Sequence, residues 1–197
     1  LAAHRAARPP RAPDPEARVR VARHEDVLRL TLTRPSHHNA FDLRTRDELI
    51  DGLRVAELDP TVRRVELSGE GPSFCAGGDL GEFGDLPDPA RAHLVRLHRS
   101  AARAIWTVRD RVVVRLHGAC IGSGIELAAF ASRVVVAPDA RIGLPELDMG
   151  LIPGAGGTVS LPARIGRHRT MALALRGQTI DAATALGWGL ADAPADR

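Results

Sequence analysis

The chain has 197 residues, 44% of them hydrophobic and 26% charged, which is enough for one domain with an apolar core. Its 27 basic residues, all arginine, are interleaved with 24 acidic ones, and only 3% of residues are aromatic, so a nucleic-acid partner is not expected. Two cysteines do not make a disulfide framework and no apolar run reaches the length of a membrane span, so we expect a cytoplasmic protein with no membrane partner.

The first predicted segment is a tail at residues 1–18, LAAHRAARPPRAPDPEAR. It is rich in alanine, arginine and proline and lacks the apolar centre of a secretory signal. We expect it to be disordered or to lie on the surface, and residues 19–197 to form one core domain.

Alternating apolar and polar residues after the tail predict a hairpin, with strands at 19–21 and 28–32 around His24-Glu25-Asp26. Further periodicity predicts helices at 43–58 and 92–108 and strands at 62–67, 112–114 and 134–136. This alternation of strands and helices predicts an α/β fold in layers, with a site in the loops at the strand ends.

The stretch HGACIGSGIELAAF, residues 117–130, sets the carboxylate of Glu126 among glycines and small apolar residues. Ser123 and Glu126 have the spacing of a capping box, in which each side chain satisfies a backbone amide of the other. The alternative is a carboxyl group in a dry pocket, where it moves a proton. Free amides at the helix start also favour an anion.

A second carboxylate, Glu146, follows Pro145 in IGLPELDMGLIPGAGGT. Alone, Glu146 is explained as a residue in the first turn of a helix, where the positive end of the helix dipole stabilises its charge. Two such carboxylates near a dry pocket, however, can act as proton donor and acceptor. The glycine-rich turn SFCAGGDL, residues 73–80, offers further amides for an oxyanion. Neither GSGIEL nor GAGGTV completes a dinucleotide or phosphate-loop motif, and no histidine or cysteine spacing indicates a metal site.

Four motifs in this order, RPSHHNAF, SFCAGGDL, HGACIGSGIELA and ARIGLPELDMGLIPGAGGTVSLPARIG, resemble the crotonase family, also called the enoyl-CoA hydratase/isomerase superfamily. The resemblance implies a crotonase-like spiral of repeated ββα units that assembles as homotrimers or dimers of trimers. It also implies an acyl-CoA or enoyl-CoA substrate, with no further cofactor and no metal.

The resemblance also implies roles for individual residues. The backbone amides of Gly78 and Ser123 would form an oxyanion hole. Glu126 would orient and activate a water, and Glu146 would deliver or remove the proton at C2 of the acyl group. Residues expected to line the CoA channel are Asn39, Ala40, Phe41, Ala76, Gly77, Asp79 and Leu80.

Three features depart from the family pattern. Ser123 stands where many relatives have glycine, so a side chain is expected at the oxyanion hole, where it restricts the acyl group. Phe130-Ala131-Ser132-Arg133 replaces a common Cys-Asp pair. The chain also ends where relatives continue, so we expect the core domain to be truncated and to lack the usual C-terminal helices.

The expected function is hydration of 2-enoyl-CoA thioesters. The alternatives are enoyl-CoA isomerisation, another acyl-CoA reaction on the same scaffold, and a catalytically silent assembly subunit.

Overall fold

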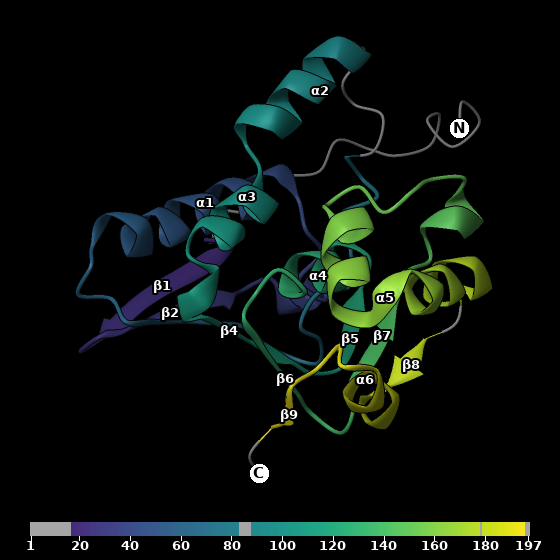
Figure 1. Ribbon diagram of the computed structural model, residues 1–197. Coiled ribbons are helices and arrows are strands. Elements are labelled where there is room, and N and C mark those ends of the chain that lie inside the picture. The colour runs from purple at the N-terminus through teal and green to yellow at the C-terminus, as the bar shows by residue number, and fades with distance from the viewer. Residues whose placement is uncertain (1–16, 83–87, 178, 196–197) are drawn as a thin grey trace.

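The computed structural model describes residues 17–82, 88–177 and 179–195, which form two β-sheets with helices packed around them (Figure 1). The larger sheet has the strand order β1 (Val19–His24), β2 (Val27–Leu32), β3 (Arg64–Gly69), β4 (Val112–Leu116), β6 (Arg133–Val136) and β9 (Ala193–Pro194). The smaller sheet has the order β5 (Ala119–Ile121), β7 (Arg141–Gly143) and β8 (Ile180–Asp181). The helices are α1 (Leu43–Leu58), α2 (Pro89–His98), α3 (Ala101–Thr107), α4 (Ser123–Ala128), α5 (Gly157–Arg176) and α6 (Ala182–Trp188), with short 3-10 turns η2 (Pro35–His37), η3 (Arg109–Arg111) and η4 (Glu146–Met149).

The predicted hairpin is confirmed as the antiparallel pair β1 and β2. Leu28, Leu30 and Leu32 point into the core, and the exposed Arg29 lies between them, because successive side chains of a strand face opposite sides. From β2 onward the strands of the larger sheet pair in parallel. The strands predicted at 62–67, 112–114 and 134–136 are β3, β4 and β6, with β3 starting two residues later than predicted.

Strands of the larger sheet are followed by a short segment in a second layer and then by a helix. This order is seen in β4–β5–α4 and again in β6–β7–α5. Two isolated parallel bridges, Phe41 with Gly78 and Cys75 with Cys120, place equivalent segments after β2 and β3. The predicted α/β fold of repeated ββα units is therefore confirmed. Figure 1 shows α1 and α3 together over the larger sheet, with α4 at the centre of the molecule.

The helix predicted at 43–58 is confirmed as α1, and its N-cap Asp42 accepts a hydrogen bond from the Thr45 amide at 2.7 Å. The single helix predicted at 92–108 is wrong. Two helices, α2 and α3, occupy this stretch, because the Ser100 hydroxyl accepts from the Arg103 amide at 3.2 Å and caps a new helix.

Of the predicted N-terminal tail, residues 1–16 lie outside the described residues. Arg18 is buried, its side chain pairs with Asp42 at 3.0 Å, and its amide donates to Glu48. Across the described ranges, every helix is too short or too polar to cross a bilayer.

Candidate active site

Two loops that are 45 residues apart in the sequence lie side by side, because Cys75 and Cys120 pair through their backbones in an isolated β-bridge. The two thiols are free. The Cys75 amide donates to the Ala119 carbonyl at 3.0 Å, and the Ile121 amide donates to the Cys75 carbonyl at 2.9 Å. Gly78 and Ser123 each follow one of the bridged cysteines by three residues. The structure thus joins the two loops that the sequence suggested as oxyanion donors.

The amide of Gly78 points away from Phe41, the residue that pairs with this segment. Phe41 donates to the Gly77 carbonyl at 2.8 Å and accepts from the Asp79 amide at 3.0 Å. Because the Gly77 carbonyl and the Gly78 N–H belong to one trans peptide group, they point in opposite directions, so the Gly78 amide faces away from Phe41. In the described part of the chain no group accepts a hydrogen bond from it.

Ser123 is the first residue of α4, where backbone amides have no partner inside the helix. Its own amide donates to no group in residues 17–82, 88–177 and 179–195. The N-cap is Gly122, which has a φ of 50° and makes no side-chain cap bond, so the predicted capping box is wrong. Helix α4 starts one residue earlier than a serine cap requires, and the Glu126 carboxylate has other partners.

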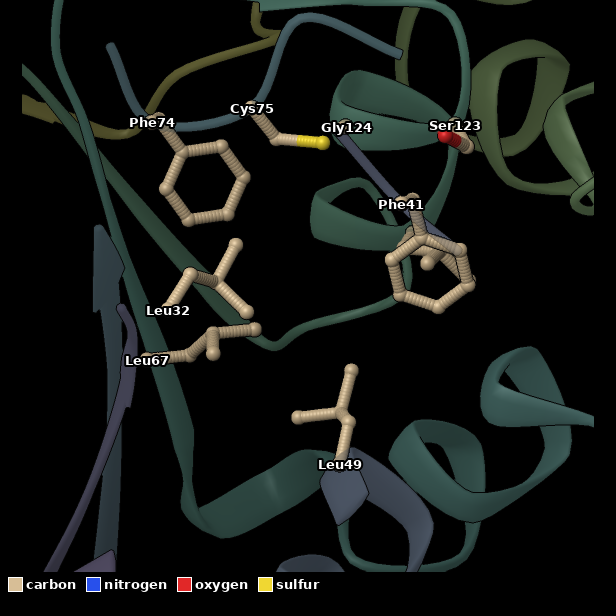
Figure 2. A pocket seen from close by; sticks show the side chains of 9 residues that line it. Leu32, Phe41, Leu49, Leu67, Phe74, Cys75, Ser123 and Gly124 are labelled. Carbon is tan, nitrogen blue, oxygen red and sulfur yellow. The ribbon is translucent and has the colours of Figure 1, made fainter. Parts of the chain in front are cut away.

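The side chain of Ser123 lines an apolar cavity of about 10 Å³ beneath the start of α4 (Figure 2). Its hydroxyl is fully buried and has no partner among the residues described. Cys75 and Phe41 line the same cavity, as do Leu32, Leu49, Leu67, Phe74, Gly124 and Leu127. The Ser123 hydroxyl therefore faces the protein interior.

Glu126 is 2% exposed, and its carboxylate is held by the loop that precedes α5. One oxygen, Oε2, accepts hydrogen bonds from the amides of Ala155 and Gly157, both at 2.8 Å. The backbone carbonyl of Glu126 accepts from the Ser160 hydroxyl at 2.7 Å. The start of α5 and the loop before it therefore hold both the carboxyl group and the backbone carbonyl of Glu126.

Glu146 is 8% exposed and begins η4. It lies close enough to Glu126 for the two carboxyl groups to interact. Burial, and then the charge of Glu146, raise the pKa of Glu126 to about 7, against the opposing effect of the Gly157 amide. Burial also raises the pKa of Glu146. Near neutral pH the Glu126 carboxyl group is therefore present in both its protonated and its ionised form.

The predicted CoA-channel residues have different surroundings. The side chain of Asn39 is 1% exposed and is used by the backbone: its amide donates to the carbonyls of Glu70 and Ser73, and its oxygen accepts from the Arg34 amide. It shapes the loop and is not free for a ligand. Ala76 is exposed and Leu80 is 57% exposed, so both are accessible.

The other four predicted channel residues are partly or fully covered. Ala40 is half-buried, Gly77 is buried, and Phe41 lines the cavity below Ser123. Asp79 is half-buried and pairs with Arg34 at 2.7 Å.

Sequence reasoning missed three small residues that shape the site. The amides of Ala155 and Gly157 hold Glu126, and Gly122 leaves room for Glu146, because a Cβ there would lie 2.6 Å from its Oε1. The signal for the first two was the glycine cluster GAGG at 154–157. The described residues contain no group of three or more metal-ligating side chains.

The comparisons with known proteins agree on one family. A family model described as enoyl-CoA hydratase/isomerase matches residues 22–195. The 1,2-epoxyphenylacetyl-CoA isomerase of Escherichia coli K12 is 34% identical, and a protein of Bacillus subtilis 168 named probable enoyl-CoA hydratase is 35% identical. Each alignment covers 83% of this chain and 64% of the relative, so the chain spans somewhat less than two thirds of their length.

A solved structure gives the same result for the fold. The crystal structure of an enoyl-CoA hydratase from Thermoplasma volcanium GSS1 matches with a TM-score of 0.84 and 34% identity. The match covers 92% of this chain and 73% of that one.

Proposed function

This chain belongs to the enoyl-CoA hydratase/isomerase family, and from that premise we propose that it hydrates the double bond of 2-enoyl-CoA thioesters. The observation that carries the proposal is the pair of buried carboxyl groups, Glu126 and Glu146, together with the amides of Gly78 and Ser123, which have no acceptor among the described residues. A proton-transfer pair and an oxyanion site are the two parts that this reaction needs.

The oxyanion site would act on the thioester carbonyl. When a nucleophile adds to C3, negative charge moves through the conjugated system onto the thioester oxygen. Two fixed N–H donors, from Gly78 and Ser123, would stabilise that enolate, and loss of one such donor typically slows a reaction by about 10²-fold or more. The backbone pairing of Cys75 with Cys120 holds the two loops that carry these donors, so the donors need not move as the charge forms.

The carboxyl pair would move the protons. Ionised Glu126 takes a proton from a water, the resulting hydroxide oxygen bonds to C3, and the π electrons move toward the carbonyl. Protonated Glu146 then gives its proton to C2, which restores the thioester carbonyl. The pair begins and ends with one proton, so no other cofactor is required. With a pKa of about 7, part of the Glu126 population is ionised near neutral pH, and this ionised form would act as the base.

The test is to incubate the purified protein with crotonyl-CoA, to follow the absorbance of the conjugated enoyl thioester and to weigh the product. We expect loss of absorbance and a gain in mass of one water. A product of unchanged mass from a 3-enoyl-CoA, with crotonyl-CoA left intact, would instead identify an isomerase. A folded protein that converts neither thioester would favour the silent subunit.

Assembly as a homotrimer or a dimer of trimers stays a prediction. Sedimentation of the purified chain measures it directly.

A further inference from the structure

Arg34 is a buried arginine that joins the segment before α1 to the loop carrying Gly78. It is 4% exposed and lies two residues after the end of β2. Its Nη1 atom lies 2.7 Å from the Asp79 carboxylate and 3.2 Å from the Asp42 carboxylate. The same nitrogen lies 3.5 Å from the Ala40 carbonyl. One guanidinium group thus bridges two carboxylates from different parts of the chain.

Each of those carboxylates holds a defined piece of structure. Asp42 is the N-cap of α1, where it accepts from the amide and the hydroxyl of Thr45, and it also pairs with Arg18 at 3.0 Å. Asp79 is the residue after Gly78, and its own amide is bonded to Phe41. Arg34 therefore ties the start of a long helix to the peptide next to an oxyanion donor.

The geometry requires such a tie, because glycine offers little resistance to rotation. Gly77, with a φ of 100°, and Gly78 have no side chains to hold them in place. The bonds between Phe41 and the 77–79 segment set which way the Gly78 amide points, and the Arg34–Asp79 pair anchors the far end of that segment. Buried ion pairs add little net stability compared with apolar packing, so a positioning role explains this one better than a stabilising role.

We propose that Arg34 is a positioning residue of the oxyanion site: through Asp79 it anchors the 77–79 segment, whose bonds to Phe41 set the direction of the Gly78 amide. The inference rests on the proposed function, because it assumes that this amide binds the thioester oxygen. Arg34 itself is too deeply buried to reach a substrate. Misplacement of a donor by about 1 Å is enough to cost on the order of 10²-fold in rate.

The test compares Arg34→Lys and Asp79→Asn with a matched control, Arg29→Lys. Lysine keeps the positive charge, but its shorter side chain cannot place a nitrogen where Nη1 of Arg34 meets both carboxylates, and asparagine keeps the shape of Asp79 without its charge. Arg29 lies in β2, is exposed and pairs across the surface with Glu66, so its variant should behave as wild type. Circular dichroism establishes that each variant is folded.

Two readouts separate positioning from a structural role. With crotonyl-CoA, we expect kcat to fall by at least about tenfold in both variants, with KM changed by less than about threefold. With cinnamoyl-CoA, whose absorbance shifts to the red when its carbonyl is polarised, we expect a smaller shift in both variants than in wild type and control. The second readout needs binding but no turnover.

Folded variants with the kcat and the red shift of the Arg29→Lys control would overturn the inference. So would a rise in KM at unchanged kcat and shift. A wild-type protein that shifts the absorbance of cinnamoyl-CoA but leaves crotonyl-CoA unchanged would contradict the hydratase proposal alone. The absorbance shifts of the Arg34→Lys and Asp79→Asn variants would then still test the role of Arg34. A wild type that binds cinnamoyl-CoA without any shift would contradict both.

Discussion

Gly157 begins α5, and the space where its side chain would stand is filled by Glu126. A Cβ added at this position would lie 2.5 Å from Cγ and 2.9 Å from Oε2 of Glu126. The Gly157→Ala variant must therefore displace the carboxyl group that its own amide holds. We expect kcat with crotonyl-CoA to fall at least about tenfold and the free energy of unfolding to fall by about 1–3 kcal/mol.

The matched control for that change is Gly187→Ala in α6, where nothing lies within 4 Å of an added Cβ. Alanine is the better helix former, so this variant should be as stable as wild type or more stable by up to about 1 kcal/mol, with unchanged kcat. Equal kcat values for Gly157→Ala and Gly187→Ala would mean that the position of Glu126 does not matter for turnover.

The carboxyl pair also makes the stability of the fold depend on pH. Burial raises the pKa of Glu126 from 4.5 to about 7, so between these values the folded chain binds more protons here than the unfolded chain does. Stability from this group is therefore complete below about pH 4.5 and falls as the pH rises through 7.

Urea unfolding at pH 5 and pH 8 tests this sign. We expect the free energy of unfolding of the wild type to decrease across the interval, and that of Glu126→Gln to decrease less, since glutamine does not titrate. The same decrease in both proteins would show that other groups cause it.

At the scale of elements, Ser100 decides how the chain runs between α2 and α3. Its hydroxyl caps α3 through the Arg103 amide, and α3 packs Ala101 and Ile105 into the core. Ser100→Ala should lower the free energy of unfolding by about 1 kcal/mol, since it leaves that amide without its partner. Thermal unfolding measures the effect, and Thr158→Ala, at an exposed position of α5, is the comparison. A melting temperature equal to that of the comparison would show that the cap contributes nothing.

The helices and strands show what the periodicity of apolar residues predicts well and what it does not. The alternation in β2 and the spacing of Leu49, Leu53 and Ala56 gave the hairpin and α1, because burial of one face dictates those patterns. Leu97, Ala101 and Ile105 also keep a helical spacing, yet two helices divide them. Ala101 and Ile105 face the core but Leu97 is 47% exposed, so the spacing did not show where the first helix ends, which depends on one local hydrogen bond.

For the molecule as a whole, the sequence suggested candidate residues for the site but not how they are held. Glu126 and Glu146 were singled out by the chemistry of carboxylates, and the expected roles of Gly78 and Ser123 came from the resemblance to the family. The capping box was a wrong prediction because the same spacing fits a cap and a buried acid, and only the partners of Glu126 distinguish them.

The bridge between Cys75 and Cys120 and the pairing of Arg34 with Asp79 join residues 45 positions apart. Such contacts follow from sheet topology and register. A single sequence carries no local signal for them.

The central claim is that Glu126 and Glu146 work as one proton-transfer pair, and replacing each by glutamine tests it most directly. The measurement is kcat with crotonyl-CoA for wild type, Glu126→Gln, Glu146→Gln and the control Glu48→Gln, with circular dichroism to establish folding. We expect each of the first two variants to lose several orders of magnitude in kcat and the control to keep it. Folded Glu126→Gln and Glu146→Gln proteins with near-wild-type turnover would contradict the account.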